Sequence, residues 1–165
     1  MLDGVRLVVA APPDAPLGGA VADRAAALGA VVRRVTVEDP DGAEAELGGP
    51  LDVLVWDGSA GPDGIRTALD GAWLAVRPVG AAGAPARILL LAPRPGGPHA
   101  EAVRAGLENL ARTLSVEWAR LGIRPVAVLP GAATGAAEVA ELAAFLASPA
   151  GEYYSGCAFT LGSAG

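Results

Sequence analysis

Six short apolar runs, each bounded by glycine, proline or polar residues, constrain the fold of this chain more than any other feature. Valine, isoleucine and leucine follow one another in them without the strict alternation of apolar and polar residues that marks a half-buried strand. Continuous runs of this kind are typical of strands that are covered on both faces. They predict a buried sheet built from residues 5–9, 30–37, 51–56, 87–91, 124–129 and 157–161.

Helical patterns separate these runs. In residues 17–28, 99–121 and 136–147, apolar side chains recur every three or four positions. Parallel strands need crossover connections, so strands that alternate with helices predict a parallel sheet. We expect an α/β fold: a three-layer, Rossmann-like, doubly wound parallel sheet of about six strands in a single domain, residues 1–165. Residues 39–50 are expected to form an acidic connection.

Composition limits the partners and the location of the protein. The longest apolar stretches, such as residues 88–93, are far below the roughly 20 residues that cross a bilayer, so no membrane partner is expected. The formal net charge is −6, and apart from Arg33-Arg34 the basic residues stand singly, which argues against nucleic acid as a partner. Residues 1–6 lead directly into the first run without a basic leader or a cleavage site, so we expect a cytoplasmic protein.

Few residues of this chain can hold a metal or form a covalent intermediate. It has one cysteine, Cys157, and one histidine, His99. That excludes an intramolecular disulfide and argues against a zinc site. All twelve basic residues are arginine, which excludes Schiff-base chemistry and a lysine-dependent proton relay.

Residues 104–131 carry a resemblance to a known family. Ala105-Gly106-Leu107 on the long helix, followed by a strand that ends at Pro130-Gly131, is similar to the second half of the short-chain dehydrogenases/reductases. Residues 144–157 resemble that family's last helix, turn and strand, and residues 51–55 resemble the strand before its Asn-Asn-Ala-Gly motif. The resemblance covers most of the chain and implies a Rossmann-like fold with oxidoreductase ancestry.

The family's phosphate-binding turn is degenerate in this chain. In the family, T-G-x-x-x-G-x-G brings the backbone close to the dinucleotide pyrophosphate. The matching residues 11–18 are Ala-Pro-Pro-Asp-Ala-Pro-Leu-Gly, and only Gly18 remains. Pro12 and Pro16 fix φ and lack an N–H donor, and Asp14 adds a negative charge where phosphate would lie. We therefore expect no cofactor, with Gly18 as the residual cofactor-binding residue.

The family's catalytic residues are also missing. Its tyrosine and lysine, which perform general acid–base catalysis, fall on Ala100 and Arg104. Its serine falls on Pro93 and its asparagine on Ala68. His99 is a candidate replacement proton donor; the alternative is a surface residue at the start of a helix.

Arg104 and Asp57 each have two interpretations. Arg104 either holds a ribose or another anion, or is solvated or paired in a salt bridge. Asp57 follows a strand at the edge where α/β proteins bind ligands, but an aspartate of a turn fits the same position.

Two segments of the family are expected to be missing. Little room is left before residue 51 for the family's third strand and its helix. Few residues separate Pro130-Gly131 from the helix at 136–147, where the family has its substrate lid. Thr134 lies one position before the match to a threonine that can contact nicotinamide in the family, and we expect it to be a helix N-cap.

Gly106 lies in the middle of the long helix, where glycine costs roughly 1 kcal/mol relative to alanine, so we expect an offsetting contact. In the family, this helix and the one corresponding to residues 64–77 pack against the same pair in another subunit. The resemblance implies a partner on the long helix 99–121, either a second copy or an active paralogue. The candidates for core or interface are Trp73, Leu107, Leu110, Leu114 and Trp118.

Three functions remain open at this point. The first is a catalytically inactive structural or regulatory subunit that assembles with itself or with an active family member. The second is an NAD(P)-dependent oxidoreductase for ketones or alcohols with non-standard catalytic residues. The third is a small-molecule binding module that uses the crevice at the carboxyl ends of the strands.

Overall fold

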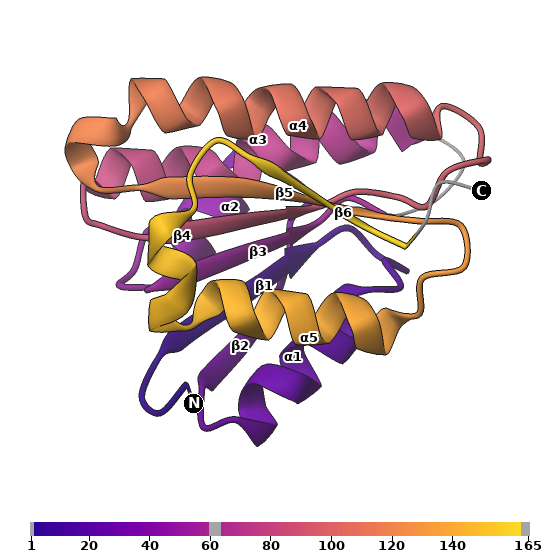
Figure 1. The fold of residues 1–165 in the computed structure, drawn as a ribbon. Coiled ribbons are helices and arrows are strands. Elements are labelled where there is room, and N and C mark those ends of the chain that lie inside the picture. Colours follow the sequence, from indigo (N-terminus) through magenta and orange to yellow (C-terminus); the bar gives the residue numbers. More distant parts are fainter. Residues whose placement is uncertain (1, 60–63, 163–165) are drawn as a thin grey trace.

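The computed structural model describes residues 2–59 and 64–162, and the six apolar runs form one sheet (Figure 1). The order across the sheet is β2-β1-β3-β4-β5-β6, and every neighbouring pair is parallel. Among the described residues no strand lies beyond β2, so the predicted sheet without the family's third strand is confirmed. The strands are β1 (Arg6–Ala11), β2 (Val31–Thr36), β3 (Val53–Asp57), β4 (Arg87–Leu91), β5 (Arg124–Pro130) and β6 (Ala158–Leu161).

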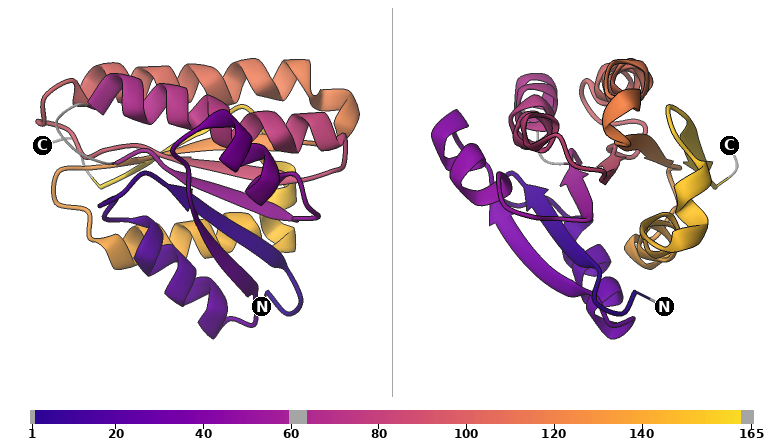
Figure 2. Two further views of the ribbon diagram at one scale, coloured as in Figure 1. Left: turned by 180° about the vertical axis from the view of Figure 1, so that it is seen from behind. Right: turned by 90° about the vertical axis from the view of Figure 1, so that its left-hand side faces the viewer.

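Helices cover both faces of the sheet and complete the three predicted layers (Figures 1 and 2). One face is covered by α1 (Gly18–Ala27) and α5 (Ala136–Ala147). The other is covered by α2 (Pro40–Leu47), α3 (Gly64–Ala82) and α4 (Ala100–Glu117). Short 3-10 turns follow α4 and α5, at Ala119–Leu121 and Pro149–Tyr153.

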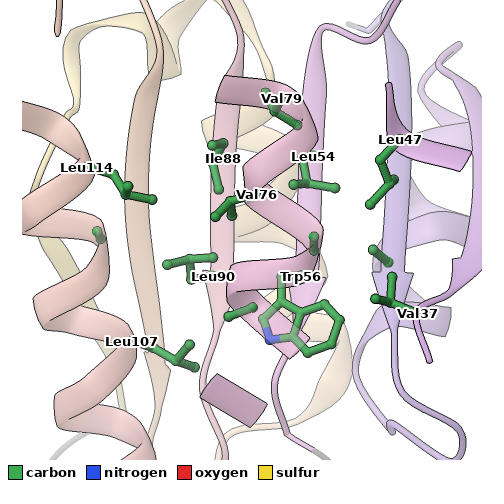
Figure 3. Packing of buried hydrophobic residues seen from close by; sticks show 14 of the residues in the cluster. Val37, Leu47, Leu54, Trp56, Val76, Val79, Ile88, Leu90, Leu107 and Leu114 are labelled. Carbon is green, nitrogen blue, oxygen red and sulfur yellow. The ribbon is translucent and has the colours of Figure 1, made fainter. Parts of the chain in front are cut away.

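Trp56 is the largest fully buried side chain and lies in the core between the sheet and α3 (Figure 3). Its indole Nε1 donates a hydrogen bond to the carbonyl oxygen of Ala68, 3.1 Å away. A Cβ atom at Gly71 would lie 2.5 Å from the indole ring, so glycine is needed there for the helix to approach. Through these contacts α3 is fixed against β3, close to the carboxyl end of that strand.

Three expectations about the helices are wrong. Residues 39–50 contain a helix, because Asp39 accepts a hydrogen bond from the backbone N–H of Gly42 (2.7 Å) and caps α2. The helix expected over 64–77 continues through Pro78 to Ala82. The long helix ends at Glu117, and the chain tightens into a 3-10 turn before Gly122, where φ is +71°.

The topology creates a switch point between β1 and β3. The chain leaves β1 toward β2 on one side of it and returns to β3 on the other. In open α/β sheets, ligands bind outside the carboxyl ends of the strands at such a point. In Figure 1 these ends face the right-hand side. Within residues 2–59 and 64–162, no helix is both long and apolar enough to cross a membrane.

Candidate functional site

A carboxylate of the chain itself lies at the switch point. Asp57, the last residue of β3, is fully buried. Its Oδ2 atom accepts hydrogen bonds from the backbone N–H groups of Leu17 (2.8 Å) and Gly18 (2.5 Å), where α1 begins. Its Oδ1 atom accepts from the N–H of Ser59 at 3.1 Å and from the Ser59 hydroxyl. The bond from the N–H of Ser59 is the bond expected of an aspartate in a turn, one of the two interpretations of Asp57. The bonds from α1 were not part of either interpretation.

The bonds from α1 to Asp57 decide what else this helix end can bind. The first N–H groups of a helix have no partner within the helix, and its N-terminus carries a partial positive charge. This is why phosphates are found at helix N-termini. Here Asp57 supplies both the acceptor atoms and the negative charge. A dinucleotide pyrophosphate does not fit the residues present, because two donors are already bonded and a buried carboxylate would repel it.

Gly18, the remaining glycine of the family's turn, has a packing role. A Cβ atom at this position would lie 2.8 Å from Cγ1 of Val9 and 3.3 Å from Oδ2 of Asp57. The missing side chain lets α1 approach β1 and β3 closely. In the preceding loop, Pro12 and Pro16 have no N–H to offer an anion, and Asp14 is exposed in a left-handed conformation with φ at +65°.

Arg104 connects the ends of two strands. Its side chain is only 12% exposed. The Nη1 atom donates to the carbonyl oxygens of Pro93 after β4 (2.8 Å) and Pro130 at the end of β5 (2.6 Å). The nearest ion-pair partner among the described residues, Glu101, is 3.9 Å away. Of the two interpretations of Arg104, the salt-bridged arginine is present as this long contact to Glu101, and the bonds to the two backbone carbonyls are additional.

The other positions at which the family has catalytic groups lie in two places. Ala68 is a buried residue of α3, and its carbonyl accepts the bond from Trp56. Pro93 and Ala100 line a pocket of ≈ 410 Å³. His99 is exposed at the start of α4, with φ at +60° and no side-chain capping bond, and it is not one of the described residues that line this pocket.

The prediction that Thr134 caps α5 is wrong. The N-cap is Gly135, and Glu138 accepts a bond from its N–H at 2.7 Å. The hydroxyl of Thr134 instead accepts from the N–H of Gly131 (2.9 Å) and donates to the carbonyl of Leu161 in β6 (3.1 Å). It closes the short turn between β5 and α5, where five residues replace the family's lid.

The proposed interface residues divide between core and surface. Leu107 and Leu114 of α4 are buried in the core. Leu110 and Trp118 are partly buried against the same core, and Trp73 of α3 is 47% exposed. The offsetting contact expected for Gly106 lies within the chain, because a Cβ there would be 2.7 Å from Cδ2 of Leu69 on α3. Gly80 likewise makes room for the Trp118 ring.

Solved structures of one family share this architecture. A short-chain dehydrogenase from Mycobacterium smegmatis has a TM-score of 0.84 at 21% identity, over 99% of this chain and 94% of that one. BdcA from E. coli gives 0.76 at 22% identity, over 98% and 100%. A dehydrogenase/reductase from Sinorhizobium meliloti gives 0.77 at 20% identity, over 95% and 93%. This chain has the short-chain dehydrogenase/reductase fold, in a shortened form. No family model and no curated protein matches its sequence.

Two contacts of this short-chain dehydrogenase/reductase fold were not predicted from the sequence. One is the capping of α1 by Asp57, and the other is the pair of hydrogen bonds from Arg104 to the carbonyls of Pro93 and Pro130. The position of Asp57 directly after a buried strand was the only signal for the first. For the second, only the match of Arg104 to the family's lysine marked the residue. Among the described residues, no group of three histidine, cysteine, aspartate or glutamate side chains is arranged to hold a metal ion.

Proposed function

We propose that this protein is a catalytically inactive subunit with the short-chain dehydrogenase/reductase fold, which binds no dinucleotide and acts by assembling with a second chain of the same fold. The observation that carries the proposal is the bonding of Asp57 to Leu17 and Gly18. It places a fixed internal anion where the fold would otherwise receive the pyrophosphate.

The chemistry of the neighbouring positions supports the same conclusion. General acid–base catalysis needs a titratable group within hydrogen-bond reach of the substrate. Pro93 and Ala100, which line the pocket, have no titratable side chain. Arg104 is held by two backbone carbonyls. An arginine side chain also keeps its proton under ordinary conditions.

A strip of apolar residues along the seam of α3 and α4 supports assembly. Leu69 of α3 contacts α4 at Gly106. Ile65 and Trp73, one helical turn before and after Leu69, lie on the same face of α3 and are 38% and 47% exposed. We assign this strip to the contact with a second copy, with an active paralogue as the alternative partner, in the cytoplasm.

Calorimetric titration with NADH and with NADPH tests the first half of the proposal. We expect no heat of binding at cofactor concentrations up to the millimolar range. A dissociation constant in the micromolar range, together with hydride transfer to a ketone, would instead establish the oxidoreductase.

Sedimentation of matched variants tests the second half. Trp73→Glu is expected to shift a dimer or larger assembly toward the monomer, because it places a charge within the apolar strip. Tyr153→Glu changes an aromatic residue that is 90% exposed on another surface and should leave the assembly intact. The alternative partner is tested by co-purification with an active reductase encoded nearby. A wild-type protein that is a monomer and captures no such reductase would contradict the proposal, as would an assembly that only Tyr153→Glu disrupts.

A further inference from the structure

The pocket beside α4 has a definite chemical character of its own. It encloses ≈ 410 Å³ between Gly58 and Ser59 at the end of β3, the loop that follows β4, and the first turns of α3 and α4. That volume is within the usual range for small-molecule sites. Its walls are small, apolar and rigid, since much of the lining is proline, whose φ is fixed. The apolar lining includes Pro16, Pro93, Pro95, Pro98, Ala100 and Val103.

Arg94 is the one charged residue among the described residues that line this pocket. Its Nε atom donates to the carbonyl oxygen of Thr134 at 2.7 Å, which fixes the plane of the guanidinium. Within residues 2–59 and 64–162, its two terminal nitrogens have neither a hydrogen-bond partner nor an ion pair. Two parallel N–H donors of a guanidinium match the two oxygens of a carboxylate.

Among the residues that the structure describes, the nearby acidic groups do not neutralise Arg94. Asp57 is bonded to α1 and to Ser59. Glu101 is largely exposed and lies 3.9 Å from Arg104. The start of α4, which borders the pocket at Ala100, adds the partial positive charge of a helix N-terminus.

We propose that this pocket binds a small carboxylic acid with a compact apolar body, whose carboxylate pairs with Arg94. The apolar body contacts the proline-rich wall, and water is displaced from both. Inorganic phosphate fits less well, because it has no apolar part and the pocket offers one guanidinium for a doubly charged ion. The site includes Pro93 and Ala100, which match the family's catalytic serine and tyrosine, and it does not depend on the proposed assembly.

Titration followed by ¹⁵N–¹H NMR on the full chain tests the proposal with defined probes. Benzoate and 2-methylpropanoate are the carboxylates, benzamide is the neutral match for benzoate, and inorganic phosphate is the second anion. We expect at least one carboxylate to shift the amide signals of the pocket residues and to bind at least tenfold more tightly than benzamide or phosphate. Failure of both carboxylates to bind, or equal binding of benzoate and benzamide, would overturn the proposal, as would tighter binding of phosphate.

Three variants locate the binding. Arg94→Gln should weaken carboxylate binding at least tenfold, whereas Arg120→Gln, which changes an exposed arginine after α4, should leave it unchanged. Gly64→Leu adds a side chain to the pocket lining, at a position where the nearest described atom to a Cβ is the carbonyl oxygen of Pro98 at 3.9 Å. This variant should abolish binding. Amide spectra of each variant report whether the fold is intact. Carboxylate binding that survives both Arg94→Gln and Gly64→Leu in folded protein would place the ligand elsewhere and overturn the proposal.

Discussion

Oδ2 of Asp57 and the backbone nitrogen of Gly18 are 2.5 Å apart, although the two residues are 39 positions apart in the chain. The contact joins the end of β3 to the start of α1, the two elements that border the switch point of the sheet. In a nucleotide-binding sheet this is where the helix N-terminus meets a phosphate. An internal carboxylate that meets the same donors stabilises the loop and removes the need for a ligand to neutralise the helix end.

Replacing Asp57 should therefore destabilise the protein. Asp57→Ala leaves the buried N–H groups of Leu17 and Gly18 without an acceptor, and each unsatisfied group costs about 1–3 kcal/mol. We expect a loss of about 2–4 kcal/mol in the free energy of unfolding, measured by urea denaturation. Asp70→Ala, at an exposed aspartate of α3, is the control and should change stability by less than about 0.5 kcal/mol.

Asp57→Ala also tests whether the carboxylate of Asp57 takes the place of a bound phosphate or only makes a buried contact. If Asp57 replaces an anion, millimolar pyrophosphate should restore part of the stability of Asp57→Ala, because a ligand that binds only the folded state stabilises it. Wild-type protein should show no such gain. An Asp57→Ala protein as stable as the wild type would contradict the account of this contact.

Trp56 and Gly71 give a second prediction, in which packing opposes helix propensity. Alanine is favoured over glycine in a helix by about 1 kcal/mol. At Gly71, however, the added Cβ would lie 2.5 Å from the buried indole of Trp56, and overpacking of this kind costs about 1–3 kcal/mol. We expect Gly71→Ala to lower the melting temperature.

Gly19 is the matched control for Gly71. It lies in α1, and a Cβ there meets no atom within 4 Å. Gly19→Ala should stabilise the protein by about 0.5–1 kcal/mol. If both alanine variants shifted the melting temperature in the same direction, the packing argument for Gly71 would be wrong.

The layers of the fold were predictable because strands covered on both faces leave a continuous apolar pattern, as Val53 to Trp56 show. Helix α2 was missed because only Ala43 and Leu47 are buried hydrophobics among its residues 41–47. Its acidic composition resembles that of a connecting loop. The pair Asp39-Pro40, an N-cap followed by proline at the first helical position, was the available signal.

The absence of the family's catalytic residues could be predicted from the sequence, but the contacts that Asp57 and Arg104 make in this structure could not. Pro93 and Ala100 show directly that no serine or tyrosine is present at these positions. The bonds of Asp57 and Arg104 depend on segments 40 and 26 residues away, which the topology brings together. A single sequence contains no local pattern for such contacts.

Arg104 gives the third prediction. Its guanidinium joins the carbonyls of Pro93 and Pro130 across the ends of β4 and β5, and charged hydrogen bonds contribute about 1.5–3 kcal/mol each. Arg104→Met should lower the free energy of unfolding by about 2–4 kcal/mol. Arg104→Lys, which restores the residue type of the family, should recover only part of this loss because one ammonium does not reproduce the planar fork. A full recovery of the free energy of unfolding by Arg104→Lys would contradict this role of the guanidinium.

Asp52 and Arg6 give a prediction that depends on pH. Arg6 donates to Asp52 through Nη2 (2.6 Å), Nε (3.0 Å) and its backbone N–H (2.8 Å). The side-chain bonds of Arg6 are the main cause of a pKa of Asp52 below the ordinary value of 3.8, and partial burial opposes the shift. Because the pKa is lower in the folded state, the pair stabilises the protein fully above the unfolded value. This contribution falls as the pH drops through 3.8 toward the folded pKa.

Asp52→Asn should therefore be less stable than the wild type at pH 7, with the difference shrinking as the pH falls below 4. The measurement is urea unfolding of both proteins at several pH values and at low ionic strength, since salt screens an exposed pair. Asp70→Asn, at an aspartate without an ion pair in the described residues, provides the baseline. A difference between Asp52→Asn and the wild type that stays constant from pH 7 to pH 3 would show that the carboxylate charge of Asp52 does not stabilise the amino ends of β1 and β3.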